Sequence, residues 1–259
     1  MTSLTDLLHS LKLAHVAEHH VALAKEAAAA PWSHLEFLQR LLEGECAVRR
    51  QRAVERRVRA ARFPVIKTLD QFRWDWPKKI NRPQVQHLFR LGFIAQKTNV
   101  IFAGGVGLGK SHLAAALGYA ACQQGHSVLF TTAVDAINNL VAAQATHRLK
   151  AELNRYLAPA VLILDEIGYL PLDKAGADLL FQIVSQRYER GSLIVTTILR
   201  DNPAKVALGN KVDDPGEYKA SDMHNIETLQ KSSPFERSFL QLPKVIFFNF
   251  EIAARFYRV

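Results

Sequence analysis

Residues 99–197 alternate between short apolar runs and helical patterns, and this alternation constrains the fold more than any other feature of the sequence. The runs are rich in β-branched residues and have the length of strands that are buried on both faces. Strands that alternate with helices predict a parallel sheet covered on both sides, which is an α/β fold. The expected strands are NVIFA at 99–103, HSVLFTT at 126–132, AVLILDE at 160–166 and SLIVTT at 192–197.

Helical patterns separate these runs, and local signals mark several of their ends. Thr132 and Asp135 have the spacing of a capping box, in which each side chain satisfies a free backbone amide at a helix start. Gly125 and Gly191 stand where helices would end. The expected helices span 111–125, 134–149 and 174–191.

A glycine-rich stretch directly follows the first expected strand. It reads GGVGLGKS from Gly104 to Ser111 and fits the phosphate-loop pattern G-x-x-x-x-G-K-[ST]. Glycines let successive amides curl around an anion, and the helix that begins near Lys110 adds its positive dipole end. An incidental glycine-rich turn is the alternative, but the strand before and the helix after disfavour it. We expect nucleotide contacts from Gly104, Gly105, Val106, Gly107, Leu108, Gly109, Lys110, Ser111 and His112.

The strand AVLILDE ends in two carboxylates that should lie at the same sheet edge as the glycine-rich loop, because ligands bind at the carboxyl ends of parallel strands. We expect Lys110 to reach the β and γ phosphates, and the Ser111 hydroxyl and Asp165 to hold a hydrated Mg²⁺. Glu166 would polarise the attacking water. Two acids that only cap a strand are the simpler alternative. The pattern favours a nucleoside triphosphate site in which Lys110 and Glu166 are catalytic.

Residues 1 to about 62 predict a separate helical domain. Leucines recur at helical spacing near the start, and Ser33 and Glu36 have capping-box spacing at the head of a helix that extends to about Ala61. Residues 63–98 contain prolines and tryptophans and are expected to form a connector. Within it, residues 67–76 (KTLDQFRWDW) are a candidate strap that ties the helical domain to residues 99–197.

The second helix of this domain carries arginines at spacings of three, four and three residues, which predicts a basic face. The whole chain has 33 Lys and Arg against 24 Asp and Glu, a formal net charge of +9 that favours a polyanionic partner. A solvated face is the alternative, but stacked like charges destabilise a helix unless an anion relieves them. The expected phosphate-backbone contacts are Arg49, Arg50, Arg52, Arg56, Arg57 and Arg59, with Arg62 flanking them.

The two cysteines, Cys46 and Cys122, are too few for a disulfide framework and lack the spacing of zinc ligands. The first residues show no basic leader followed by an apolar core. No apolar run approaches the length that a membrane-spanning helix needs. These features predict a cytoplasmic protein.

Together the motifs resemble the IstB-type transposition helper proteins, AAA+ ATPases that are related to helicase loaders and replication initiators. The resemblance implies a P-loop NTPase (AAA+) core with a small N-terminal all-helical domain. It also implies ATP and Mg²⁺ binding, oligomers on duplex DNA, and presentation of that DNA to a partner transposase. It covers about residues 1–197 and rests on LKLAHVAEHH, RRQRAVERRVRAARFPVIKTLDQF, GGVGLGKSHLAAALGYAACQQGHSVLFTT and LILDEIGYLPLDKAGADLLFQIVSQRYERGSLIVTT.

Residues 198–259 depart from that family and form a divergent C-terminal segment. The family places a sensor asparagine after the strand that corresponds to SLIVTT, where this chain has Ile198. The family's Asp-Arg-Leu segment is also missing, and its arginine is worth ~10³ to 10⁵ in rate when it acts on a neighbouring subunit's ATP. The candidate substitutes are Arg187, Arg190 and Arg200.

Four interpretations of function stay open. A transposition helper leads, and a helicase loader of the same fold is second. The third is a nucleotide-binding DNA-assembly protein with impaired hydrolysis. A small-molecule P-loop kinase is a distant fourth, because no second domain resembles an acceptor-binding lid. The apolar stretch LPKVIFFNFEIAARFYRV at 242–259 would pack as a late strand and helix on the core, or else its segment VIFFNF would expose an aggregation-prone surface.

Overall fold

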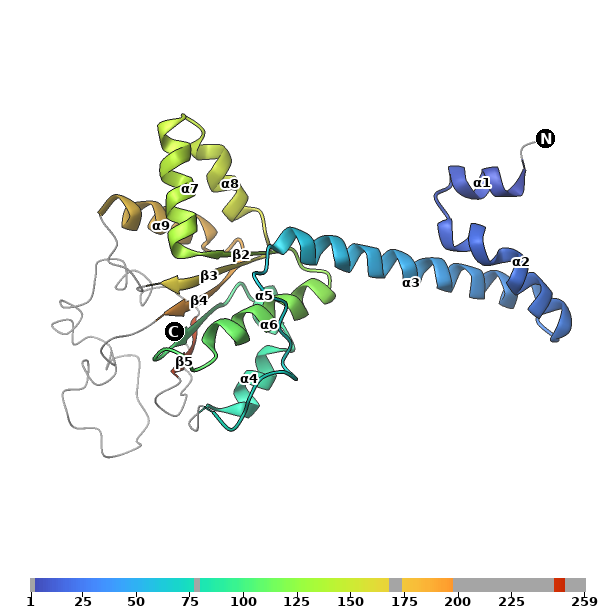
Figure 1. The fold of residues 1–259 in the computed structure, drawn as a ribbon, viewed down its shortest axis with the longest axis horizontal. Helices are drawn as coiled ribbons and strands as arrows, with labels where there is room; N and C mark the ends of the chain where they lie inside the picture. The colour runs from blue at the N-terminus through green and yellow to red at the C-terminus, as the bar shows by residue number, and fades with distance from the viewer. Residues whose placement is uncertain (1–2, 77–79, 168–173, 198–244, 250–259) are drawn as a thin grey trace. The chain divides into compact units, whose positions relative to one another are not determined.

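The computed structural model describes residues 3–76, 80–167, 174–197 and 245–249 (Figure 1). Contacts within the chain divide it into two compact units, residues 1–56 and 57–259, and each unit is described on its own. The first unit is helical, as the sequence predicts. Its elements are α1 (Leu4–Ser10), α2 (Ala14–Ala29) and most of α3 (His34–Ala61).

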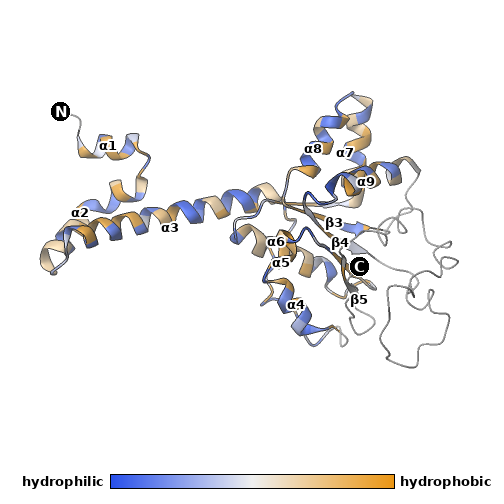
Figure 2. Ribbon diagram, turned by 180° about the vertical axis from the view of Figure 1, so that it is seen from behind, coloured by the Kyte–Doolittle hydropathy of each residue, from blue (hydrophilic) through white to orange (hydrophobic). Residues whose placement is uncertain are grey.

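Capping sets the starts of two of these helices. Ser3 and Asp6 form a capping box at the start of α1. At the start of α3 the Glu36 amide donates to the Ser33 hydroxyl at 3.2 Å, so the predicted cap is present. Hydrophilic and hydrophobic residues alternate along α3 (Figure 2), and most of its side chains are exposed or half-buried.

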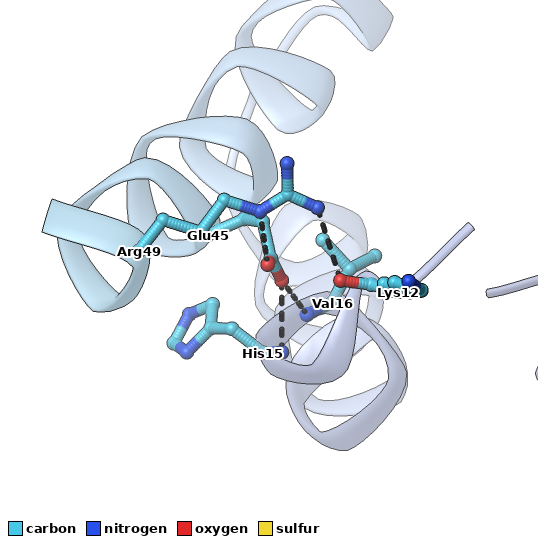
Figure 3. Close-up of polar contacts among 5 residues, drawn as sticks. All are labelled: Lys12, His15, Val16, Glu45 and Arg49. Carbon is cyan, nitrogen blue, oxygen red and sulfur yellow. Dashed lines mark hydrogen bonds and ion pairs between the residues drawn. The ribbon is translucent and has the colours of Figure 1, made fainter. Parts of the chain in front are cut away.

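A buried carboxylate joins α3 to the start of α2 (Figure 3). Glu45, only 3% exposed, accepts the backbone amides of His15 at 2.9 Å and Val16 at 3.4 Å. The residue before α2 is a leucine, whose side chain has no oxygen to cap the helix. Glu45 on α3 caps the start of α2 instead. Arg49 completes the cluster by donating to Glu45 and to the Lys12 carbonyl, at 2.9 and 3.0 Å. We call these five residues the Glu45 clamp.

Burial alone would raise the pKa of Glu45, but the hydrogen bonds from Arg49 and from the two amides outweigh it and lower that pKa below its ordinary value. A carboxyl whose pKa is lower in the folded state stabilises it at pH above the unfolded value. That contribution is lost as the pH falls through the folded value. The clamp therefore stabilises the first unit at neutral pH and weakens below about pH 4.

We predict that Glu45→Ala destabilises the packing of α2 by about 2 kcal/mol at pH 7, because a helix cap and a buried partner of Arg49 are lost together. Hydrogen exchange at the His15 and Val16 amides measures the effect, and the difference from the native chain should shrink toward pH 3. Glu43→Ala is the matched control, since Glu43 is exposed on the same helix. Equal exchange in the two variants would contradict the role of the clamp.

The second unit is built on a five-stranded sheet in the order β2-β3-β4-β1-β5, and every neighbouring pair is parallel. The parallel α/β prediction is confirmed. The fifth strand comes from the apolar run near the end of the chain, which confirms the late strand, and the helix expected after it lies outside the described residues. The strands are β1 (Asn99–Ala103), β2 (Val128–Thr132), β3 (Val161–Ile167), β4 (Ser192–Thr197) and β5 (Val245–Asn249).

Helices cover both faces of the sheet because side chains alternate along each strand (Figure 1). Val100 and Phe102 pack into one core with α6, while Ile101 packs into a second core with α7, α8 and α9. Within the described residues no helix is long and apolar enough to cross a membrane. The helices are α4 (Arg82–Leu88), α5 (Gly92–Ala95), α6 (Lys110–Gln123), α7 (Ala133–Ala145), α8 (Leu149–Leu157) and α9 (Lys174–Arg187).

The structure differs from the sequence prediction after β2. The predicted helix at 134–149 ends at Ala145, and a separate helix, α8, follows. The Thr146 hydroxyl donates to carbonyls of the last turn of α7, at 3.1 and 3.3 Å. The backbone of His147 then has a positive φ. A right-handed helix cannot continue through a residue in that conformation, so α7 and α8 are separate helices.

The expected connector contributes to the core. Val85 and Leu88 of α4 and Phe93 and Ile94 of α5 are buried in the same core as α6. Pro83 lies in the first turn of α4, where its missing amide costs no helical hydrogen bond. The predicted domain boundaries at 62, 98 and 197 stay predictions.

Candidate nucleotide-binding site

The glycine-rich loop lies between β1 and α6, at the carboxyl edge of the sheet. Gly107 and Gly109 both have positive φ values, in the left-handed region where residues with a Cβ are strained. Gly109 is doubly constrained, because a Cβ there would lie 2.6 Å from the Phe72 ring. The loop therefore needs glycine at position 109 for both its conformation and its packing.

Lys110 opens α6 and is buried, with 8% of its surface exposed. Its Nζ donates to the Gly105 carbonyl at 2.6 Å, so the side chain turns back over the loop that precedes it. This places a cationic group at the amino end of α6, where the helix dipole also favours an anion. The predicted phosphate-binding lysine thus lies within the loop.

Ser111 and Asp165 meet at this edge, although 54 residues separate them. The Ser111 hydroxyl donates to Asp165 Oδ1 at 2.8 Å, and Asp165 is 6% exposed. A hydroxyl and a carboxylate are hard oxygen ligands, and Mg²⁺ binds through one or two such groups with water and phosphate completing its shell. These oxygen ligands therefore fit Mg²⁺, and the two residues predicted to hold it, Ser111 and Asp165, lie within hydrogen-bond distance of each other.

Glu166 departs from the regular strand. Its φ is positive, and its side chain is exposed whereas that of Asp165 is buried. The Glu166 amide donates to the Thr196 hydroxyl of β4 at 2.9 Å, and the same hydroxyl donates to Asp165. Thr196 was not a candidate from sequence, because only the pairing of β3 with β4 places it beside the two acids.

The strap at 67–76 packs against the glycine-rich loop. Phe72 is 5% exposed and contacts Gly109, and its ring lies 5.5 Å from that of His112 in an edge-on arrangement. His112 Nε2 is also hydrogen-bonded to the Thr68 carbonyl at 3.0 Å. His112 was expected to contact nucleotide, and here it anchors the strap. The aromatic residues of the strap were visible in the sequence, but their target was not.

Arg187 is not available as a substitute arginine finger, so this candidate is wrong. It is 1% exposed, and its guanidinium donates to four backbone carbonyls. Three of them lie at the end of α8 and in the link to β3, and the fourth is that of Ser192 at the start of β4. Burial lowers the pKa of Arg187 to about 10, so it stays charged at neutral pH. Arg190 is exposed at the amino end of β4, which is opposite the loop, and Arg200 and Ile198 lie outside the described residues.

The six arginines predicted to contact DNA divide into two groups. Arg49 belongs to the Glu45 clamp, although 53% of its side chain is exposed, and Arg57 is half-buried near Cys122 and Gly125. The other four are exposed on α3: Arg50, Arg52, Arg56 and Arg59. Contact with DNA stays a prediction for all six.

The sheet, the loop and the acids of β3 define a P-loop NTPase of the AAA+ class with an N-terminal helical unit. The family described as IstB-like ATP binding protein matches residues 6–210. The chain belongs to this family.

Relatives agree with that assignment. An ATP-binding protein of insertion sequence IS21 from Pseudomonas aeruginosa is 41% identical over 197 residues, 76% of this chain and 74% of the relative. One of insertion sequence IS5376 from Geobacillus stearothermophilus is 36% identical over 192 residues, 74% and 76% of the two chains.

Among solved structures, DnaI gives a TM-score of 0.49 at 15% identity, covering 73% of this chain and 92% of that one. The DnaC helicase loader gives 0.47 at 20%, covering 64% and 86%.

Proposed function

We propose that this chain is an ATP-dependent helper of DNA transposition that binds ATP with Mg²⁺ and assembles on duplex DNA in the cytoplasm. It would present that DNA to a partner transposase. The observation that carries the ATP part is the convergence of Lys110, Ser111, Asp165 and Glu166 at one edge of the sheet. The transposition part is supported by relatives that are ATP-binding proteins of insertion sequences.

Each of these residues has a chemical role in the proposed reaction. Lys110 Nζ would leave the Gly105 carbonyl to neutralise the phosphates, and the loop amides would bind the remaining phosphate oxygens. Ser111 and Asp165 would hold Mg²⁺, which when bound offsets charge on the phosphate oxygens. Glu166 would accept a proton from the attacking water, and its exposed side chain leaves it accessible to that water.

In this proposal the first unit mediates assembly and contacts DNA. Exposed leucines recur three and four residues apart on two of its helices, a spacing that places each set on one helix face. An apolar helix face of this kind is typical of a surface that packs against another chain. We propose that these leucines contribute to self-association, and they are Leu4, Leu7 and Leu11 on α1 and its C-cap, and Leu35, Leu38 and Leu42 on α3.

The test is duplex binding with and without ATP. Anisotropy of a labelled duplex should report salt-sensitive binding that requires ATP and that Lys110→Ala abolishes. Binding that is the same with and without nucleotide would overturn the proposal. Preference for single strands, together with capture of a replicative helicase, would favour the helicase loader instead.

We predict that Arg52→Gln with Arg56→Gln weakens duplex binding and reduces its salt dependence. Each lost phosphate contact lowers the magnitude of the slope of log K against log salt by about 0.9, so two contacts lower it by about 2. The matched control is Arg90→Gln with Lys150→Gln, which removes the same charge from positions outside α3. If the control lowers the slope equally, net charge rather than the α3 surface governs binding.

A further inference from the structure

The two acids of β3 occupy a bulge in the sheet. The register pairs Leu164 with Val195 and Ile167 with Thr197, so two residues of β3 stand opposite one residue of β4. Those two residues are Asp165 and Glu166, and the one opposite them is Thr196. Adjacent residues of a regular strand point to opposite faces, and a bulge changes the direction of one of them. Here the bulge leaves Asp165 buried and Glu166 exposed.

The Thr196 hydroxyl bonds to both halves of this bulge. The Glu166 amide can only donate, so the hydroxyl accepts from it, at 2.9 Å. An ionised carboxylate can only accept, so the hydroxyl gives its single proton to Asp165. Both directions are therefore determined, and one hydroxyl orients two consecutive acids. Asp165 Oδ1 also accepts from Ser111, so the two hydroxyls bond to the same oxygen of this carboxylate.

The neighbouring threonine binds the other side of the bulge. The Thr197 hydroxyl donates to the Ile167 carbonyl at 2.9 Å, and the Thr197 carbonyl accepts the Gly104 amide at 3.3 Å. The end of β4 thus contacts the bulge and the first residue of the glycine-rich loop. Glu166 has a left-handed backbone, a conformation that a residue with a Cβ keeps only where its surroundings hold it.

We propose that Thr196 is a positioning residue for the site: its hydroxyl holds the bulge that turns Asp165 toward Ser111 and Glu166 toward solvent. The expected effect of Thr196 on turnover rests on the proposed ATPase function. Its expected effect on the Mg²⁺ requirement for nucleotide binding does not depend on turnover. Thr196 contacts neither phosphate nor water in this role and acts only through the two acids.

The test compares Thr196→Val, which removes the hydroxyl but keeps the branched shape, with Thr196→Ser, which keeps the hydroxyl. Loss of a group that orients metal-binding residues typically costs about 10–100-fold in metal affinity or activity. For Thr196→Val we expect a turnover about 10–100-fold lower. The Mg²⁺ concentration that gives half-maximal binding of a fluorescent ATP analogue should rise about 10-fold. Analogue affinity at saturating Mg²⁺ should change by less than about threefold, and Thr196→Ser should restore both quantities.

Thr131→Val is the matched control, because Thr131 lies on β2, which pairs with β3 on the side away from β4, and its hydroxyl donates to the Thr132 carbonyl rather than to either acid. It should leave turnover and Mg²⁺ dependence unchanged. Melting curves of all variants separate loss of the fold from loss of the site. If Thr196→Val unfolds, the serine variant decides: a native Mg²⁺ requirement supports the role of the hydroxyl, and a raised Mg²⁺ requirement contradicts it.

Two outcomes would overturn the inference: a valine variant with native Mg²⁺ dependence, or a serine variant as impaired as the valine variant. A native chain that turns over no faster than Glu166→Gln would refute the hydrolysis part of the proposed function alone. The Mg²⁺ titration would then still decide the role of Thr196.

Discussion

Lys110→Ala should lower the affinity for ATP by about 10- to 150-fold, because a hydrogen bond to a charged group is worth about 1.5–3 kcal/mol. Lys110 is buried at the start of α6 and donates within the loop, so its charge is held close to the phosphate position before nucleotide arrives. Titration of a fluorescent ATP analogue measures the loss. ATP-dependent duplex binding should disappear with it.

The control for this variant is Lys150→Ala, which removes the same side chain from an exposed position on α8. It should bind the analogue like the native chain. An affinity for Lys110→Ala within about threefold of native would contradict the assignment of the loop, because a single hydrogen bond to a charged group is worth about 2 kcal/mol.

Glu166→Gln should leave nucleotide affinity nearly unchanged and slow turnover by about 10² to 10⁴-fold, the range for loss of a general base. The amide keeps the shape of the side chain but cannot take the proton from water. Phosphate release under single-turnover conditions measures the chemical step, and the fluorescent analogue measures binding on the same samples. A parallel loss of affinity and turnover would show that Glu166 serves binding rather than proton transfer.

The same pair of measurements decides whether this chain hydrolyses ATP. With Arg187 buried against carbonyls and Ile198 at the position of the family's sensor asparagine, the native rate itself is the informative quantity. A native turnover clearly above that of Glu166→Gln, and stimulated by duplex DNA, supports the helper function. Equal rates favour the DNA-assembly protein with impaired hydrolysis.

Much of the core was predictable because its signals are local. The apolar runs predicted β1 to β4, and the pattern GGVGLGKS placed the loop between β1 and α6. Capping-box spacing correctly indicated the starts of α3 and α7. The break between α7 and α8 was missed because helix-compatible residues continue through it, and the positive φ at His147 is not encoded by a glycine.

Side-chain roles were predicted less well where they depend on distant partners. Arg49 had the sequence signature of a basic helix face, and Arg187 that of a free arginine near the end of a helix. The structure uses one to support a buried carboxylate and the other to satisfy four carbonyls. A guanidinium carries several donors, so it serves either purpose equally well, and sequence spacing cannot distinguish them.

The sequence by itself determined the parallel α/β class, the phosphate-binding loop and the acids expected to face it, because periodicity and short motifs act over a few neighbouring residues. Only the tertiary structure decided which partners those residues have. Thr196 reaches Asp165 across 31 positions, and Glu45 reaches His15 across 30. Such contacts depend on strand register and helix packing, which are set by the burial of the whole core and not by any local pattern.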